Sequence, residues 1–356
     1  MSVKSRLKSI VAFGVLGICV LLAIVLYTLP SSILRSDRCE DAPRQPRNLR
    51  WQIGQTVNVD AQILWERPVP PDNLVLAASA DLVVYSQGTT GCPEDGMMIG
   101  VDASNGIKQW SSTLSSYSNT IRGIVYHDDA FLVMTCCTQV ARIDSLGQEL
   151  WVSSGLPLRA FRPSLYLDQE IIFVPTISDI EQLRLVSGSR QDTLPIERSL
   201  GVFEDITLSN PVGRILEVRS RDSQEVLWTA LLPSDNSMSD FNTYLFDQIL
   251  IVIYSGRQIT AYDKDTGMVA WELSRESKSP AIAFNEMILS YDDDKDIVFR
   301  DARSGIVLGS IELFYTDQST PEITTLSLPI MAANNDTIFL WNNVGSDLIA
   351  ISYEFW

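Results

Sequence analysis

Histidine is almost absent from this chain: His127 is the only one among 356 residues. Metal sites built from several histidines are therefore excluded, and a catalytic triad would have a single histidine to draw on. His127 lies in "VYHDDAF", a pattern typical of a turn between two strands. We interpret it as a solvated turn residue.

Basic residues are also scarce, with 27 Lys and Arg against 44 Asp and Glu, for a net charge of −17. No basic tract follows the first fifty residues, so we do not expect nucleic acid as a partner. No P-loop, dinucleotide fingerprint or nucleophile elbow occurs either. The chain therefore shows none of the common motifs for nucleotide binding or acyl transfer.

One long apolar run stands near the start. Residues 9–29, "SIVAFGVLGICVLLAIVLYTL", contain no charge and match the ~20 residues that cross a bilayer as a helix. We expect an uncleaved transmembrane signal anchor there, after a short tail over 1–8 and before a linker arm over 30–60. Residues 61–356 would form the body.

The side of the membrane is less directly encoded. Lys and Arg residues flank the apolar run on both sides, so the positive-inside count does not decide the orientation. Four of the five cysteines lie beyond the run, and paired cysteines belong to oxidising compartments. We therefore expect a single-pass protein with its body on the extracytoplasmic side.

The body repeats one sequence motif. "ITAYDKDTGMVAW" (259–271) places Trp271 four residues after Gly267, and the same spacing recurs at "IGVDASNGIKQW" and "VARIDSLGQELW". "EVRSRDSQEVLW" has Gln224 in the glycine position, "IVFRDARSGIVLG" has Gly309 in the tryptophan position, and "LRLVSGSRQDTL" is a weaker copy. The glycine positions are 106, 147, 188, 224, 267 and 305, a period of about forty residues.

Short segments rich in β-branched and aromatic residues precede each glycine position, as in "AFLVMT" and "QILIVIY". About four short strands in every forty residues predict the blades of an all-β propeller, in which each sheet covers its neighbour. Residues 346–356 match a third strand without a fourth, and "QILWERPV" around Trp65 is a fourth strand without the others. Together they complete one blade, so we predict seven blades; eight is the alternative.

The repeated residues have structural roles in this interpretation. The glycine allows a positive φ or a close approach, the preceding aspartate caps the turn, and the tryptophan packs on the adjacent blade. The predicted blade-docking residues are Trp65, Trp110, Trp151, Trp228, Trp271, Gly106, Gly147, Gly267 and Gly305.

"AYDKDTGMVAW" resembles the A-x-D-x-x-T-G-x-x-x-W motif of the PQQ-like (quinoprotein-type) repeat propellers, over roughly residues 60–356. That superfamily includes eight-bladed quinone-dependent alcohol dehydrogenases and inert scaffolds such as the lipoprotein of the outer-membrane barrel-assembly machinery. Adjacent Cys136 and Cys137 resemble the vicinal disulfide of the dehydrogenases. The short chain and the lack of their calcium ligands and catalytic aspartate favour resemblance to the scaffolds.

The cysteines also allow a purely structural interpretation. Cys92, Cys136 and Cys137 fall in loops between the second and third strands of neighbouring blades, and Cys39 lies on the arm. We expect disulfides, with Cys92 bonded to Cys136 or Cys137 and Cys39 pinning the arm. Four cysteines allow three connectivities, which the sequence leaves open.

The aspartates in "YDDDKDIVF" are a weak candidate for calcium, with Asp292, Asp294 and Asp296 as ligands. The segment lacks the glycine and distal glutamate of known calcium loops, so we expect a solvated acidic turn. "NDT" at 335–337 is a glycosylation sequon. No catalytic residue, cofactor or metal is predicted.

The leading functional hypothesis is a non-catalytic, membrane-anchored propeller that binds a protein partner on one face. One alternative is a redox enzyme that binds a quinone (PQQ) through the Cys136–Cys137 pair. The other is a sensor domain that binds calcium or a small ligand.

Overall fold

The computed structural model describes the chain from residue 49 to its end, with gaps between strands. The described residues are 49–69, 75–87, 97–114, 121–127, 129–135, 139–156, 165–168, 170–176, 179–196, 199–211, 214–232, 241–254, 258–274, 281–291, 296–317, 323–324, 330–342 and 347–356. They contain no helix that could span a membrane. The expected anchor at 9–29 lies outside them.

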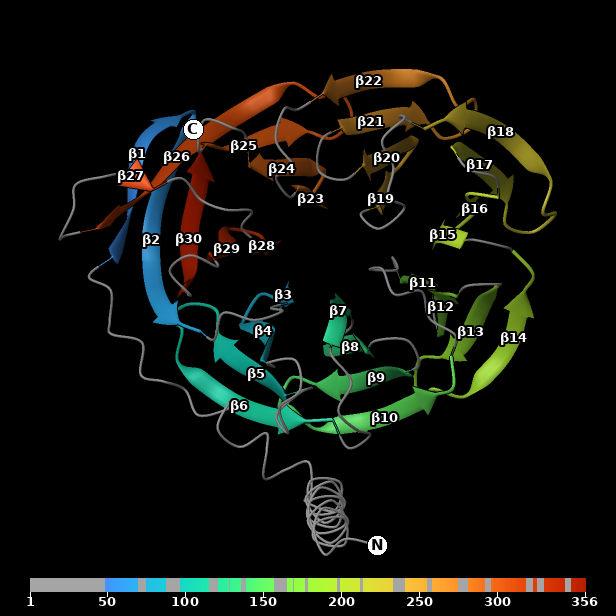
Figure 1. Ribbon diagram of the computed structural model, residues 1–356, viewed down its shortest axis with the longest axis horizontal. Coiled ribbons are helices and arrows are strands. Elements are labelled where there is room, and N and C mark those ends of the chain that lie inside the picture. Colours follow the sequence, from blue (N-terminus) through green and yellow to red (C-terminus); the bar gives the residue numbers. More distant parts are fainter. Residues whose placement is uncertain are drawn as a thin grey trace, which may run out of the picture. The chain divides into compact units, whose positions relative to one another are not determined.

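The described strands form seven antiparallel sheets arranged in a closed ring (Figure 1). The prediction of a seven-bladed all-β propeller is therefore confirmed, and the alternative count of eight is wrong. Within each blade the strands run from A, the innermost, to D. This order follows the sequence in blades one to six.

The first three blades follow one another along the chain. Blade one contains β3 (Leu76–Ala78), β4 (Leu82–Gln87), β5 (Met97–Asp102) and β6 (Lys108–Thr113). Blade two contains β7 (Ile121–His127), β8 (Ala130–Thr135), β9 (Gln139–Asp144) and β10 (Glu149–Ser154). Blade three contains β11 (Tyr166–Asp168), β12 (Ile171–Pro175), β13 (Ile180–Arg184) and β14 (Arg190–Leu194).

The next two blades continue in the same direction around the ring. Blade four contains β15 (Ser199–Val202), β16 (Ile206–Ser209), β17 (Ile215–Ser220) and β18 (Val226–Leu231). Blade five contains β19 (Phe241–Phe246), β20 (Ile249–Tyr254), β21 (Gln258–Asp263) and β22 (Val269–Ser274).

The last two blades take strands from both ends of the described chain. Blade six contains β23 (Ala281–Phe284), β24 (Met287–Tyr291), β25 (Asp296–Asp301) and β26 (Val307–Asp317), with β1 (Leu49–Val57) and β27 (Ile323–Thr324) both paired to β26. Blade seven contains β28 (Ile330–Ala333), β29 (Thr337–Asn342), β30 (Asp347–Phe355) and, as its outer strand, β2 (Val59–Pro68).

The residue pattern of each strand matches its place in the blade. β20, "ILIVIY", is almost wholly buried because neighbouring blades cover both of its faces. β22, "VAWELS", lies at the outer rim and alternates between exposed and partly buried residues. Hydrophobicity therefore falls from the B and C strands to the D strand of one blade.

Blade closure involves an additional strand that the sequence analysis did not predict. β1 falls within the range expected to form a linker arm, and it pairs antiparallel with β26 at the outer edge of blade six. Asn58, with φ of 56°, then reverses the chain into β2, which pairs with β30 in blade seven. The two consecutive strands pair with different blades, β1 with β26 and β2 with β30, and so hold the outer edges of two adjacent blades together. We call this strand–turn–strand segment the β1–β2 hairpin.

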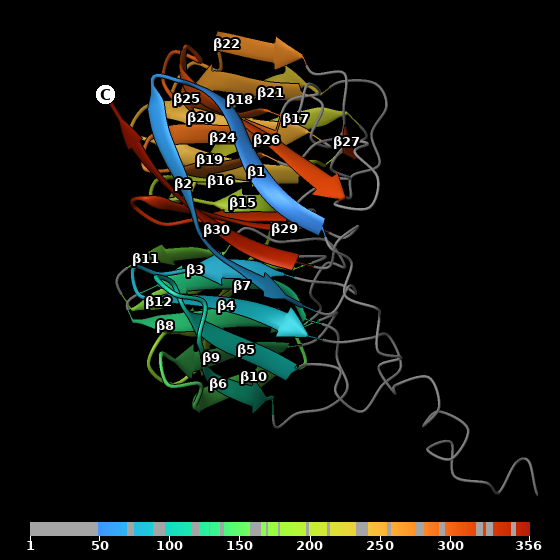
Figure 2. The same cartoon turned by 90° about the vertical axis from the view of Figure 1, so that its left-hand side faces the viewer.

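The turns between strands A and B and between strands C and D lie on one face of the ring. This follows from the antiparallel order of each blade, because both turns join strands at the same end. Figure 2 shows this end on the left, where the chain also terminates after β30. We call it the turn face.

Candidate functional site

The repeated tryptophan of one blade packs on the repeated glycine of the next. A Cβ atom added to Gly267 would lie 2.5 Å from the Trp228 ring, so only glycine leaves room for the indole. The glycines at these turns also have positive φ, 70° at Gly267. The pairs in contact are Trp65–Gly106, Trp110–Gly147, Trp151–Gly188, Trp228–Gly267 and Trp271–Gly305.

Each of these indoles also donates a hydrogen bond to the same turn. The Trp228 Nε1–H donates to the Lys264 carbonyl oxygen at 2.6 Å. The equivalent acceptors are the carbonyl oxygens of Ala103 for Trp65, Ser145 for Trp110, Leu185 for Trp151 and Ala302 for Trp271. The buried indole therefore satisfies its polar atom while it covers the neighbouring blade.

Aspartates stabilise these turns from within. The Asp263 carboxylate accepts hydrogen bonds from the Thr266 hydroxyl at 2.7 Å and the Thr266 amide at 2.8 Å. The hydroxyl contact and then the amide lower the pKa of Asp263 below its usual range. Asp102 and Asp301 have lowered pKa values for the same reason, with a serine hydroxyl as the first donor.

The junction between blades three and four lacks the tryptophan. Asp192 occupies that position, and the glycine position of blade four is Gln224 with φ of 60°. The Gln224 side-chain amide donates to the Arg221 carbonyl oxygen at 2.6 Å. The Arg221 guanidinium lies over the Phe173 ring of blade three, 5.4 Å from its centroid. A cation–π contact therefore links these two blades.

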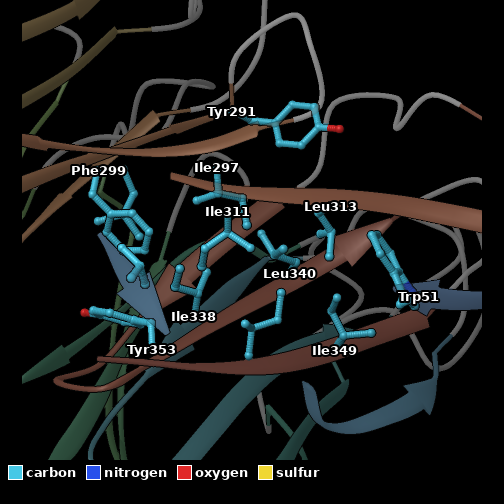
Figure 3. Close-up of a cluster of buried hydrophobic side chains, with 13 residues drawn as sticks. Trp51, Tyr291, Ile297, Phe299, Ile311, Leu313, Ile338, Leu340, Ile349 and Tyr353 are labelled. Carbon is cyan, nitrogen blue, oxygen red and sulfur yellow. The ribbon is translucent and has the colours of Figure 1, made fainter. Parts of the chain in front are cut away.

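The junction between blades six and seven lacks the repeated tryptophan as well. Gly309 occupies the tryptophan position, and a Cβ there would lie 2.4 Å from Val59 and 2.6 Å from the Val57 carbonyl oxygen. The β1–β2 hairpin fills the space instead, and the Asn58 amide donates to the Leu308 carbonyl oxygen. Figure 3 shows the large apolar cluster between blades six and seven, which includes Trp51.

The predicted chemical residues lie mostly outside the described chain. Cys39, Cys92, Cys136 and Cys137 are outside it, as are Asp292 and Asp294. The disulfide, quinone and calcium hypotheses therefore stay predictions. Asp296 is described and begins β25; burial raises the pKa of Tyr291, and the charge of Asp296 raises it further. In the described part of the chain, no cluster of three or more potential metal ligands occurs.

The turn face carries a feature that the sequence analysis missed. Every A–B turn holds an exposed carboxylate, and none of the seven contains Lys or Arg. The signal was visible as an acidic residue just before the second strand of most blades. One such carboxylate per turn is that of Asp81, Asp129, Glu170, Asp205, Asp247, Glu286 and Asp336, and the turn of blade four also holds Glu204.

A groove of about 960 Å³ opens where the β1–β2 hairpin meets blade seven. Its acidic lining comes from Asp60, Asp336 and Glu354, and no Lys or Arg is among the described residues that line it. Tyr353 and Phe355 add aromatic surface. Burial, followed by the nearby charge of Asp336, raises the pKa of Tyr353 to about 12.

Comparison with known proteins supports the repeat type. A family model described as "Outer membrane protein assembly factor BamB" matches residues 203–354, from the A–B turn of blade four into β30 of blade seven. The resemblance to the PQQ-like repeat propellers is confirmed. A comparison with curated proteins found no match.

Solved structures share the fold at low sequence identity. The crystal structure of BamB from Moraxella catarrhalis is 13% identical, with a TM-score of 0.53, over 82% of this chain and 100% of that chain. The computationally designed Ika8 protein is also 13% identical, with a TM-score of 0.52 and the same coverage. At this identity the likeness concerns the propeller fold alone.

Proposed function

We propose that this chain is a non-catalytic, membrane-anchored scaffold whose propeller binds a protein partner on the extracytoplasmic side. The observation that carries the proposal is the match of residues 203–354 to a family described as an outer membrane protein assembly factor. The printed description concerns the assembly of proteins, and a ring of stacked blades offers the extended surface that contact with another protein needs.

The shape of the described body adds support. Indole–glycine contacts at five junctions, the β1–β2 hairpin at a sixth and the Arg221–Phe173 contact at the seventh make a continuous ring. Each blade then presents its turns at a fixed position relative to the next. Such a surface can hold a partner without folding on binding, which lowers the entropic cost of association.

Site-specific photocrosslinking in the native membrane would test the proposal. A photoreactive residue is placed in the full-length chain at Ser104 on a C–D turn, at Asn335 on an A–B turn or at Asp192 on an outer strand. We expect a discrete protein adduct from at least one position. The matched control joins residues 1–48 to an unrelated soluble body. The proposal fails if no position gives an adduct that is absent from this control.

A fractionation experiment would test the anchor separately. The full-length chain should remain with membranes after alkaline carbonate washing, and a chain that begins at residue 46 should be released. Added protease should degrade the body in spheroplasts, whose outer barrier has been removed, and in sealed outward-facing vesicles. It should leave the body intact in cells that keep the outer barrier. Release of the full-length chain, or protection of the body on the cytoplasmic side, would contradict the proposed topology.

A further inference from the structure

One carboxylate from each A–B turn, seven in all, differs from blade to blade in how it is neutralised. Lys264 of blade five forms an ion pair with Asp205 of blade four. Arg303 of blade six pairs with Asp247 of blade five and, at 3.3 Å, with Glu286 of its own blade. These cations come from C–D turns and connect adjacent blades, so Asp205, Asp247 and Glu286 have a structural partner.

The other four acids have no such cation. Within the described chain, no Lys or Arg forms an ion pair with Asp336, Asp81, Asp129 or Glu170. They belong to blades seven, one, two and three, which follow one another around the ring (Figure 1). These four carboxylates therefore keep a charge that no ion pair within the described chain neutralises, and we call these four residues the acidic arc.

The groove provides an independent observation at one end of this arc. It is concave, and Asp336 belongs both to its lining and to the arc. Its other carboxylates, Asp60 and Glu354, lie opposite each other on paired strands β2 and β30. Apolar surface from Ile53 and Phe355 lies in the same groove. Carboxylates beside aromatic rings are the surroundings that suit an Arg or Lys side chain with its aliphatic stem.

We propose that the groove and the acidic arc together bind an extended basic segment of a protein partner. A basic side chain enters the groove between the three carboxylates, and the segment continues across blades one to three. The inference rests on the proposed scaffold function and specifies the chemistry of the partner. The net charge of −17 favours rapid encounter with such a segment, and the arc fixes where it settles.

Fluorescence anisotropy with a labelled peptide tests the site. In the probe, arginine alternates with serine and a lysine ends the chain; glutamate replaces arginine in the control peptide. The groove variant Asp60→Asn/Asp336→Asn/Glu354→Gln and the arc variant Asp81→Asn/Asp129→Asn/Glu170→Gln are compared with the full-length wild type. Each should bind the basic peptide about tenfold more weakly, since three exposed charge pairs together contribute about that much.

A matched variant removes three exposed acids elsewhere. Asp192→Asn/Asp222→Asn/Glu225→Gln changes the net charge equally but leaves groove and arc intact. It should bind the peptide like the wild type. Equal weakening of all three variants would overturn the proposal, because binding would then depend on overall charge. Absence of binding to the wild type at low ionic strength would overturn it as well.

Carboxyl-to-amine crosslinking of the wild type gives a readout that does not depend on how variants fold. The terminal lysine of the probe should form amide bonds to Asp60, Asp336 or Glu354, or to acids of the arc, as mapped by mass spectrometry. Crosslinks confined to other acids would overturn the proposal. If photocrosslinking in membranes finds a partner on another surface, the scaffold function stands and only this site fails.

Discussion

The side-chain amide of Gln224 donates a hydrogen bond to the carbonyl oxygen of Arg221. In blades one, three, five and six, the carbonyl three residues before the glycine position accepts an indole N–H from the preceding blade. Arg221 occupies that acceptor position in blade four. Gln224 therefore supplies from its own blade the donor that the missing tryptophan would have supplied, and its side chain fills the space.

A double substitution should restore the indole at this junction. Asp192→Trp alone places a ring against the Gln224 side chain, and Gln224→Gly alone removes the donor to Arg221. Combined, they recreate the pair seen at the other junctions. Adding the effects of the two single substitutions gives an expected free energy of unfolding for the double variant. We expect the value measured by urea unfolding to exceed that sum by about 1–3 kcal/mol. Additive effects would show that the two positions are not coupled.

The indole contacts themselves should contribute strongly to stability. Trp228 is buried and hydrogen-bonded, so Trp228→Ala should lower the free energy of unfolding by about 3–5 kcal/mol. Trp356, which is 77% exposed at the chain end, is the control. Trp356→Ala should change stability by less than about 0.5 kcal/mol. Similar losses for both variants in chemical denaturation would contradict the docking role of Trp228.

Glycine requirements can be separated into backbone and steric parts. Gly155 and Gly267 both have positive φ, but only Gly267 faces an indole; the nearest atom to a Cβ at Gly155 is an Arg190 nitrogen at 3.5 Å. Gly155→Ala should cost roughly 1–2 kcal/mol, the price of left-handed backbone alone. Gly267→Ala should cost clearly more, because Trp228 must also move. Equal costs in thermal or urea unfolding would remove the steric argument.

Acid should weaken the C–D turns in a defined pH window. The lowered pKa of Asp263 adds stability above its unfolded value of about 3.9, and this contribution disappears as pH falls through the folded pKa. Thr266→Val removes the hydroxyl donor, so the pKa of Asp263 should rise towards its usual value in an NMR titration. Thr113→Val, at an exposed strand end, should leave it unchanged. An unaltered Asp263 titration in Thr266→Val would contradict the assignment.

The sequence was sufficient to predict the fold class because one sequence motif recurs in each blade. A glycine followed four residues later by tryptophan predicts a turn and an outer strand, and counting the copies gave the seven blades that the structure shows. Its weak copies could not be interpreted in the same way. Gln224 in the glycine position looked like simple divergence, although it compensates for Asp192 in the preceding blade. Only the contact between blades shows that the two departures belong together.

The acids of the turn face were missed for a related reason. Asp81 and Asp336 are far apart in sequence and each is unremarkable in its own turn. They become one surface because the ring brings blades seven and one side by side, where the Asn334 amide donates to the Ser79 carbonyl oxygen. Whether an acid keeps a free charge depends on the C–D turn of the next blade, as Lys264 shows for Asp205.

Strand β1 was missed because it lacks the repeat motif, whereas the strand around Trp65 (β2) was predicted from it. At the junction of blades six and seven the missing tryptophan is replaced by this additional strand and the turn into β2, not by a side chain of the next blade. Gly309→Trp would restore the repeat, yet Val59 and the Val57 carbonyl already occupy the space beside Gly309. The new ring would displace the hairpin from blade six, including buried Trp51.

We therefore expect Gly309→Trp to lower the free energy of unfolding by more than about 3 kcal/mol, since overpacking and the loss of buried surface add. Protease cleavage within β1 should also become faster. The Asp192→Trp/Gln224→Gly variant is the control, because it restores tryptophan where space can be made. Gly309→Trp as stable as that control would show that the hairpin does not occupy the tryptophan position.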